Sequence, residues 1–231
     1  MRRLSETDVS NKTIALRVDL NAPLQDGKVL DDTRILAIVP TLKYLIDKNS
    51  KITLISHFGR PEPGSFDSKF SLSPVAKRLG EILNKQIPLF TSIDDVHFNE
   101  DISLIENIRF LSGELTNDFN LSNKLCNLAD VYVFDAFGTS HRSHASTYGA
   151  IQAAESSCAG LLLENETDVL KKATDSQDSP TLFIVGGSKV SSKLEVIKSL
   201  LQISDEVLTG GGITNTFLKA KGNNIGLSLC E

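Results

Sequence analysis

The fold of this chain is decided by the stretch Val131-Tyr132-Val133-Phe134-Asp135-Ala136-Phe137-Gly138-Thr139-Ser140-His141-Arg142-Ser143-His144. Its four leading apolar residues predict a buried strand, and the residues after them gather an acid, two imidazoles and a guanidinium. Loops that follow buried strands often carry binding sites, and a cationic cluster at such a place suits a small anion. The alternative is a polar loop whose His and Arg side chains meet only solvent.

The same alternation of apolar runs and helical patterns extends outward through the chain. Strands are predicted over 13–20, 51–56, 86–90, 102–110, 131–137, 181–185 and 206–208. Helices are predicted over 34–48, 74–84, 121–128, 161–173, 191–201 and 213–221. This order predicts an α/β fold: a doubly wound, mostly parallel, Rossmann-like sheet with helices on both faces, followed by the start of a second α/β domain.

The polar segment 174–180 is the best candidate for a boundary between domains. We expect an anion-binding domain over 1–160, an interdomain helix and linker over 161–179, and the start of another domain over 180–231. This last part holds about two βα units, which is too little apolar surface for an independent domain. We therefore expect the second domain to be incomplete in this chain.

Composition narrows the class of function. The 231 residues are 40% hydrophobic and 23% charged with a net charge of −5, which is typical of a soluble globular protein and gives no general attraction to nucleic acid or membrane. The three cysteines form no C-x-x-C pair, so neither a metal site nor a disulfide framework is expected. With no apolar leader or transmembrane stretch, we expect a cytoplasmic protein.

Cationic side chains recur where predicted strands end. Ligands of open α/β sheets sit outside the carboxyl ends of the strands, and arginine suits forked binding of carboxylate or phosphate. The residues that we expect to converge there are Arg34, Arg60, Arg109, Arg142 and His57, with Asp19 and Asn21 available for hydroxyl groups. As alternatives, Arg109 could pair with Glu106, and Arg34 with Asp31 or Asp32.

A second constellation follows the strand at 181–185. Gly186 and Gly187 precede a helical pattern, so Lys189 and Lys193 should share one face at the start of a helix, an arrangement that favours phosphate. The glycines at 210–212 repeat the arrangement of strand, glycines and helix. A solvated lysine pair is the alternative. Neither stretch spells G-x-G-x-x-G, which disfavours a dinucleotide-dependent oxidoreductase.

At this point the chain resembles the phosphoglycerate kinase family. The motifs that carry the resemblance are RVDLNAP at 17–23, TRI at 33–35, HFGRP at 57–61, ENIRF at 106–110, and the longer stretches 134–146, 186–193 and 210–218. The resemblance implies a glycolytic, cytoplasmic, monomeric enzyme. Its reaction would be reversible transfer of a phosphoryl group from 1,3-bisphosphoglycerate to ADP with Mg²⁺, giving 3-phosphoglycerate and ATP. Phe58 stands where leucine is more usual.

The resemblance also implies roles for individual residues. Binding of 3-phosphoglycerate would fall to Asp19, Leu20, Asn21, Arg34, His57, Phe58, Gly59, Arg60, Arg109 and Arg142. The residues expected to take part in catalysis are Arg34, Lys189 and Gly211. The residues expected to bind the nucleotide are Lys189, Lys193, Gly211 and Gly212. Family members continue past Glu231, where the acid that handles Mg²⁺ would lie. We therefore expect a phosphoglycerate site with little or no kinase activity, and the alternative is a non-catalytic anion-binding module.

Overall fold

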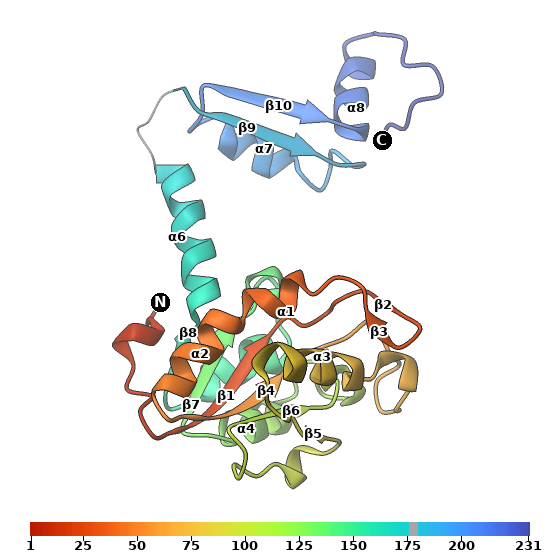
Figure 1. Cartoon of the computed structure of the whole chain (residues 1–231). Coiled ribbons are helices and arrows are strands. Elements are labelled where there is room, and N and C mark those ends of the chain that lie inside the picture. Colours follow the sequence, from red (N-terminus) through yellow and green to blue (C-terminus); the bar gives the residue numbers. More distant parts are fainter. Residues whose placement is uncertain (176–179) are drawn as a thin grey trace. The chain divides into compact units, whose positions relative to one another are not determined.

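The computed structural model describes residues 1–175 and 180–231, which divide into two compact units, Met1–Thr167 and Asp168–Glu231 (Figure 1). The division falls within helix α6 (Leu161–Asp175). Positions 176–179 of the predicted linker lie outside the described residues. The interdomain role of 161–179 therefore stays a prediction.

A six-stranded sheet forms the centre of the first unit, in the order β5-β6-β4-β1-β7-β8, with every pairing parallel. Its strands are β1 (Thr13–Val18), β4 (Lys51–Ile55), β5 (Leu89–Phe90), β6 (Ile102–Ile105), β7 (Val131–Asp135) and β8 (Ser157–Ala159). A small antiparallel hairpin of β2 (Leu24–Gln25) and β3 (Lys28–Val29) follows β1. The predicted α/β fold with a parallel sheet is confirmed.

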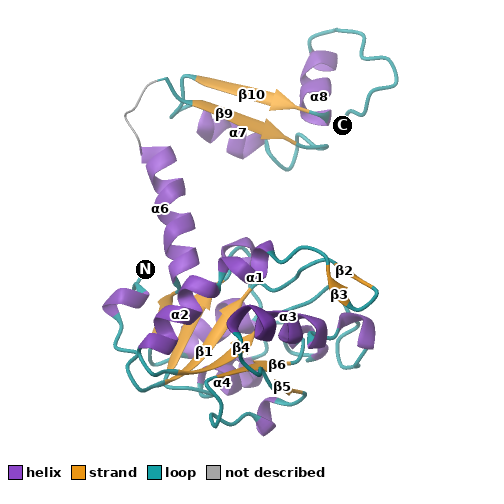
Figure 2. Ribbon diagram, viewed as in Figure 1, coloured by secondary structure: helices purple, strands orange, loops and turns teal. Residues whose placement is uncertain are grey.

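Helices cover both faces of this sheet (Figure 2). They are α1 (Thr33–Ala37), α2 (Val39–Asp47), α3 (Ser73–Leu83), α4 (Phe119–Cys126) and α5 (Ala150–Ala153). Successive residues of β1 point to opposite faces, so Leu16 shares a buried cluster with Leu42 of α2 and Leu79 of α3. Ala15 belongs to the cluster on the other face, with Leu125 of α4. Apolar burial on both faces explains the continuous apolar runs in the sequence.

Two predicted elements are interrupted for identifiable reasons. The helix expected over 34–48 breaks at Ile38, because Pro40 has no N–H for the helical hydrogen bond and instead stands in the first turn of α2. The strand expected over 102–110 ends at Ile105. Beyond it, the Asn107 side chain accepts the N–H of Arg109 and begins a short 3₁₀ turn, Ile108–Phe110. Strand β8, the hairpin and α5 were not predicted, since each is too short for a periodic pattern.

The second unit has two parallel strands, β9 (Leu182–Gly186) and β10 (Glu206–Gly210), with helices α7 (Leu194–Leu200) and α8 (Gly212–Ala220). Its buried cluster centres on Val185, Ile197 and Ile213. Helix α7 begins three residues later than predicted, at Leu194 instead of 191. Across the part of the chain that the structure describes, no helix is both long and apolar enough to cross a membrane.

Candidate functional site

Strand β1 lies at the point where the order of the sheet reverses. The chain passes from β1 to β4 on one side and later returns to β7 on the other side. The loops that leave the carboxyl ends of these three strands therefore meet, and they carry residues 19–21, 57–60 and 136–144. Such a reversal is where open α/β sheets bind their ligands.

Three of the predicted arginines line one hollow of about 340 Å³, which we call the arginine hollow. Its lining residues are Arg60, Pro61, Arg109, Leu115, Arg142 and His144. Arg109 is 7% exposed, and its Nε–H has no hydrogen-bond partner among the residues that the structure describes. Burial, followed by the charges of Arg142 and Arg17, lowers the pKa of Arg109. A buried guanidinium with a free N–H beside like charges is a site that an anion would stabilise.

Arg17 and His57 form a buried contact beneath these loops. Arg17 donates from Nε to Ser146 Oγ at 2.9 Å, and its Nη2 lies 3.4 Å from His57 Nδ1. Because a guanidinium only donates, Nδ1 must accept and the imidazole proton lies on Nε2. Burial, and next the charge of Arg17, lowers the pKa of His57 to about 2. His57 is therefore a neutral imidazole with one N–H to donate.

The buried carboxylate of Glu114 partly balances these positive charges. Glu114 is fully buried and accepts hydrogen bonds from the Ser146 N–H at 2.9 Å and the Ser146 hydroxyl at 2.7 Å. Its Oε1 also lies 3.7 Å from Nδ1 of His144. Burial lowers the pKa of His144, and the Glu114 charge opposes that change. The negative charge of Glu114 thus balances part of the positive charge of the site.

Arg34 lies outside the arginine hollow. Its guanidinium is paired with the Asp19 carboxylate, not with Asp31 or Asp32. The two line a second hollow of about 340 Å³ together with Asp135, Ala136, Phe137, Gly138, Leu162 and Glu166. Asp19 Oδ1 is 4.0 Å from His57 Nδ1, so Asp19 lies between Arg34 and His57. The structure therefore brings together three of the four arginines, whereas Arg34 lies at a separate hollow and is linked through Asp19 to His57.

The remaining residues predicted for this site support its loops. The side chains of Leu20 and Phe58 are buried in the main apolar cluster. Their N–H groups already donate to Ser56 Oγ and to Asn107 Oδ1 respectively. Asn21 accepts the N–H of Gly59 at 2.9 Å. These groups hold the loops after β1 and β4 in place.

Sequence reasoning did not select Arg17, Glu114, Asn107 or Ser146 as site residues. Arg17 had one usable signal, since it is the single charged residue in the apolar strand Thr13–Val18. Glu114 lies in an irregular segment whose sequence gives no sign of burial. Its role depends on long-range contacts that only the folded chain reveals.

The glycine-rich turns of the second unit pack backbone against backbone. Gly211 has a φ of +65°, a conformation that favours glycine. A Cβ on Gly212 would lie 2.5 Å from the carbonyl oxygen of Ser188. The Ile213 N–H donates to the carbonyl of Gly187 at 3.1 Å. The two turns therefore approach each other more closely than side chains would allow.

The predicted shared helix face of Lys189 and Lys193 is wrong. Helix α7 begins at Leu194, so Lys193 directly precedes it and Lys189 lies in the loop after β9, both exposed. This loop nevertheless binds a carboxylate. The Ser191 N–H donates to Glu231 at 2.7 Å, and the hydrogen bonds from Ser191 lower the pKa of Glu231. The loop's backbone and hydroxyl donors are therefore suited to anionic oxygen.

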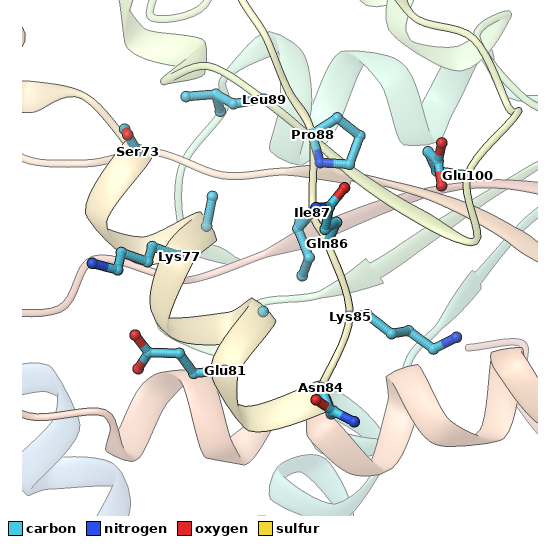
Figure 3. A pocket seen from close by; sticks show the side chains of 12 residues that line it. Ser73, Lys77, Glu81, Asn84, Lys85, Gln86, Ile87, Pro88, Leu89 and Glu100 are labelled. Atoms are coloured by element: carbon cyan, nitrogen blue, oxygen red, sulfur yellow. The ribbon is translucent and has the colours of Figure 1, made fainter.

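A larger hollow, about 740 Å³, lies elsewhere, between α3 and the segment 84–89 (Figure 3). Lys77 and Lys85 point away from each other there, and Lys85 is paired with Asp101. None of the charged side chains that line it is buried. Its size exceeds that of the arginine hollow, but it lacks convergent polar groups. Within residues 1–175 and 180–231, no three His, Cys, Asp or Glu side chains gather to hold a metal ion.

Comparison with known proteins gives one consistent family. The family model described as phosphoglycerate kinase matches residues 4–231. Proteins named phosphoglycerate kinase from Desulfovibrio desulfuricans and Francisella tularensis subsp. novicida are 44% and 46% identical over 230 residues, covering 99% of this chain and 59% of each relative.

Solved structures agree. The phosphoglycerate kinase of Coxiella burnetii matches with a TM-score of 0.90 at 42% identity, over 99% of this chain and 59% of that one. The enzyme of Pyrococcus horikoshii OT3 matches with a TM-score of 0.84 at 34% identity, over 98% and 59%. The chain thus spans about three fifths of the length of these relatives.

Proposed function

The chain belongs to the phosphoglycerate kinase family, and from this premise we propose that its arginine hollow binds 3-phosphoglycerate. The family reaction is the reversible transfer of a phosphoryl group between 1,3-bisphosphoglycerate and ADP. Residues 1–160 would then form the phosphoglycerate-binding domain, and residues 180–231 the start of the nucleotide-binding domain.

The observation that carries the proposal is the free Nε–H of Arg109 in a hollow lined by two further arginines. The substrate has a phosphate at one end and a carboxylate at the other. Forked guanidinium groups bind such oxygens with two parallel hydrogen bonds. We assign Arg60, Arg109 and Arg142 to the phosphate, and the Nε2–H of His57 to a substrate oxygen.

Asp19, Asn21 and Arg34 complete the proposed substrate site. Asp19 would accept the substrate hydroxyl, and Arg34 would approach the end of the substrate that exchanges the phosphoryl group. Leu20, Phe58 and Gly59 form the wall behind it, since two are in the apolar cluster and Gly59 is bonded to Asn21. Such a division positions the reactants, which is most of what phosphoryl transfer requires of a protein.

For the transfer itself we propose Arg34, Lys189 and Gly211. In the forward direction, the bond between the acyl oxygen and phosphorus breaks as the terminal phosphate oxygen of ADP bonds to phosphorus, leaving a carboxylate. Arg34 and Lys189 would neutralise charge on the migrating group. Lys193, with the backbone at Gly211 and Gly212, would bind nucleotide phosphate. Mg²⁺ would arrive with the nucleotide and neutralise part of its phosphate charge.

The start of helix α8 at Gly212 supports the nucleotide assignment, since the first N–H groups of a helix suit phosphate. We further propose that the protein acts in glycolysis as a cytoplasmic monomer. The free state of all three cysteines is compatible with a reducing compartment.

Calorimetry tests the two halves of the proposal separately. Titration with 3-phosphoglycerate should give saturable binding, whereas glycerate, which lacks the phosphate, should bind much more weakly. Equal binding of both would contradict the assignment of the arginines to phosphate. Titration with Mg-ADP should give independent binding at the second unit. Absence of that binding would leave a non-catalytic anion-binding module and would contradict the proposed kinase function.

A further inference from the structure

We infer that Asn107 is a positioning residue for the arginine hollow. Its side-chain amide sets where the Arg109 backbone and the peptide that leads into Arg60 lie, so it controls anion affinity without touching the anion. This inference rests on the proposed function of the hollow.

The Asn107 amide is 1% exposed and bonded at every position it has. Its Oδ1 accepts the N–H of Phe58 at 3.0 Å and the N–H of Arg109 at 3.1 Å. Its Nδ2 donates to the carbonyls of Phe58 at 2.7 Å and Phe70 at 2.9 Å. Two donor hydrogens and two acceptor lone pairs are the whole capacity of an amide. One side chain therefore joins three segments that are distant in sequence.

These bonds reach the two arginines through Gly59. Asn107 holds both polar backbone groups of Phe58, the residue directly before Gly59. The guanidinium of Arg109 donates to the Gly59 carbonyl, and the Gly59 N–H donates to Asn21. Gly59 has a φ of +57°, and the Phe70 ring occupies the place where a Cβ would project. These contacts hold the backbone at Gly59 in place, and they therefore also fix where the next residue, Arg60, begins.

Only an amide can serve at this position. An aspartate would accept hydrogen bonds but donate none to the two carbonyls, and a leucine of similar size would do neither. The neighbouring Glu106 holds part of the same region independently. Its carboxylate accepts the Leu72 N–H at 2.8 Å and the Ser71 hydroxyl at 2.7 Å. We therefore expect an Asn107 variant to fold while its loops at 58–60 and 108–110 shift.

The test compares Asn107→Leu with Leu45→Ala in the full chain. Leu45 is fully buried in α2, and removing its side chain leaves a cavity without altering any contact of the hollow. At a temperature where circular dichroism shows both variants folded, calorimetry measures the affinity for 3-phosphoglycerate. Asn107→Leu should weaken it at least about tenfold and Leu45→Ala less than about twofold. Equal affinities in the two variants would overturn the inference.

A double-mutant cycle asks whether Asn107 acts through Arg109. Added to Arg109→Met, the Asn107→Leu change should weaken binding clearly less than it does in the wild-type chain, because one of the two arginines that it positions is already gone. A full, additive loss would mean that Asn107 does not act through Arg109.

A ligand-free measurement separates the failure of this inference from failure of the proposed function. In ¹⁵N–¹H spectra, Asn107→Leu should shift the Arg109 Nε–H and Gly59 N–H resonances, and Leu45→Ala should leave both in place. If the wild-type chain does not bind 3-phosphoglycerate, the proposed function is wrong and these spectra alone decide the role of Asn107. Unchanged resonances in Asn107→Leu would overturn it.

Discussion

Arg17 and His57 meet in the interior of the first unit, where Arg17 Nη2 lies 3.4 Å from His57 Nδ1. The contact makes Nδ1 an acceptor and leaves the proton on Nε2. We predict that ¹⁵N NMR of the free protein at pH 7 shows an unprotonated Nδ1 and a protonated Nε2. Arg17→Met should remove this preference and give a mixture of tautomers. A ring protonated on Nδ1 in the wild-type protein would contradict the assignment.

The burial of His57 predicts how acid affects stability. The pKa of His57 falls from an ordinary 6.5 to about 2 in the folded protein, with burial as the largest cause. Between these values the unfolded chain binds a proton that the folded chain excludes, so stability falls as pH drops below 6.5. His57→Gln should make the free energy of unfolding less dependent on pH between 6.5 and 4. The free energy of unfolding is measured by urea denaturation at each pH. The same change with pH in both proteins would contradict this prediction.

Arg109 should reveal a conflict between stability and binding. Replacing it with methionine removes a buried, partly unpartnered charge from beside Arg60 and Arg142, at the loss of one hydrogen bond to Gly59. We predict that Arg109→Met is within about 1 kcal/mol of wild-type stability or more stable. Its affinity for 3-phosphoglycerate should fall about 30-fold or more.

Arg78→Met is the matched control for this prediction. Arg78 pairs with Asp32 and Glu81, away from the residues that line the hollow, so its loss should leave binding unchanged. A stable Arg109→Met protein that binds as well as Arg78→Met would remove Arg109 from the site.

The fold was predictable because strands of a parallel sheet are buried on both faces and therefore appear in the sequence as continuous apolar runs. Apolar runs such as the one at 131–134 indicated the strands, and the alternation of strands with helices indicated the parallel arrangement. The breaks were harder to predict. Pro40 could have indicated the division between α1 and α2, but the end of β6 depends on the Asn107 side chain, which competes for backbone hydrogen bonds.

The candidate site was predictable only for its arginines. Arg60, Arg109 and Arg142 stood out because charged residues at strand ends are informative without a structure. Glu114 and Asn107 were not predicted as site residues. Each acts through hydrogen bonds to backbone groups that are more than thirty positions away in the sequence. The predicted start of α7 was wrong for a local reason. Lys193 is the N-cap residue, so the turn that precedes it is not part of the helix.

Glycine substitutions test the packing of the second unit. A methyl group on Gly212 would meet the Ser188 carbonyl, whereas nothing lies within 4 Å of a Cβ on Gly186. We predict that Gly212→Ala lowers the hydrogen-exchange protection of β9, β10 and α8, and that Gly186→Ala leaves it near wild type. Neither change should alter 3-phosphoglycerate binding, since the arginine hollow is lined by residues of the first unit. Equal protection in both variants would contradict the close packing of the two turns.

The Arg109 Nε–H has no acceptor among the described residues and carries the proposed phosphate site, and NMR observes that group directly. The ¹⁵N–¹H resonance of Arg109 Nε should move progressively and saturably as 3-phosphoglycerate is added to the full chain, because the phosphate supplies the missing acceptor. A resonance that stays in place while backbone amides elsewhere report saturation would show that the ligand binds outside the arginine hollow.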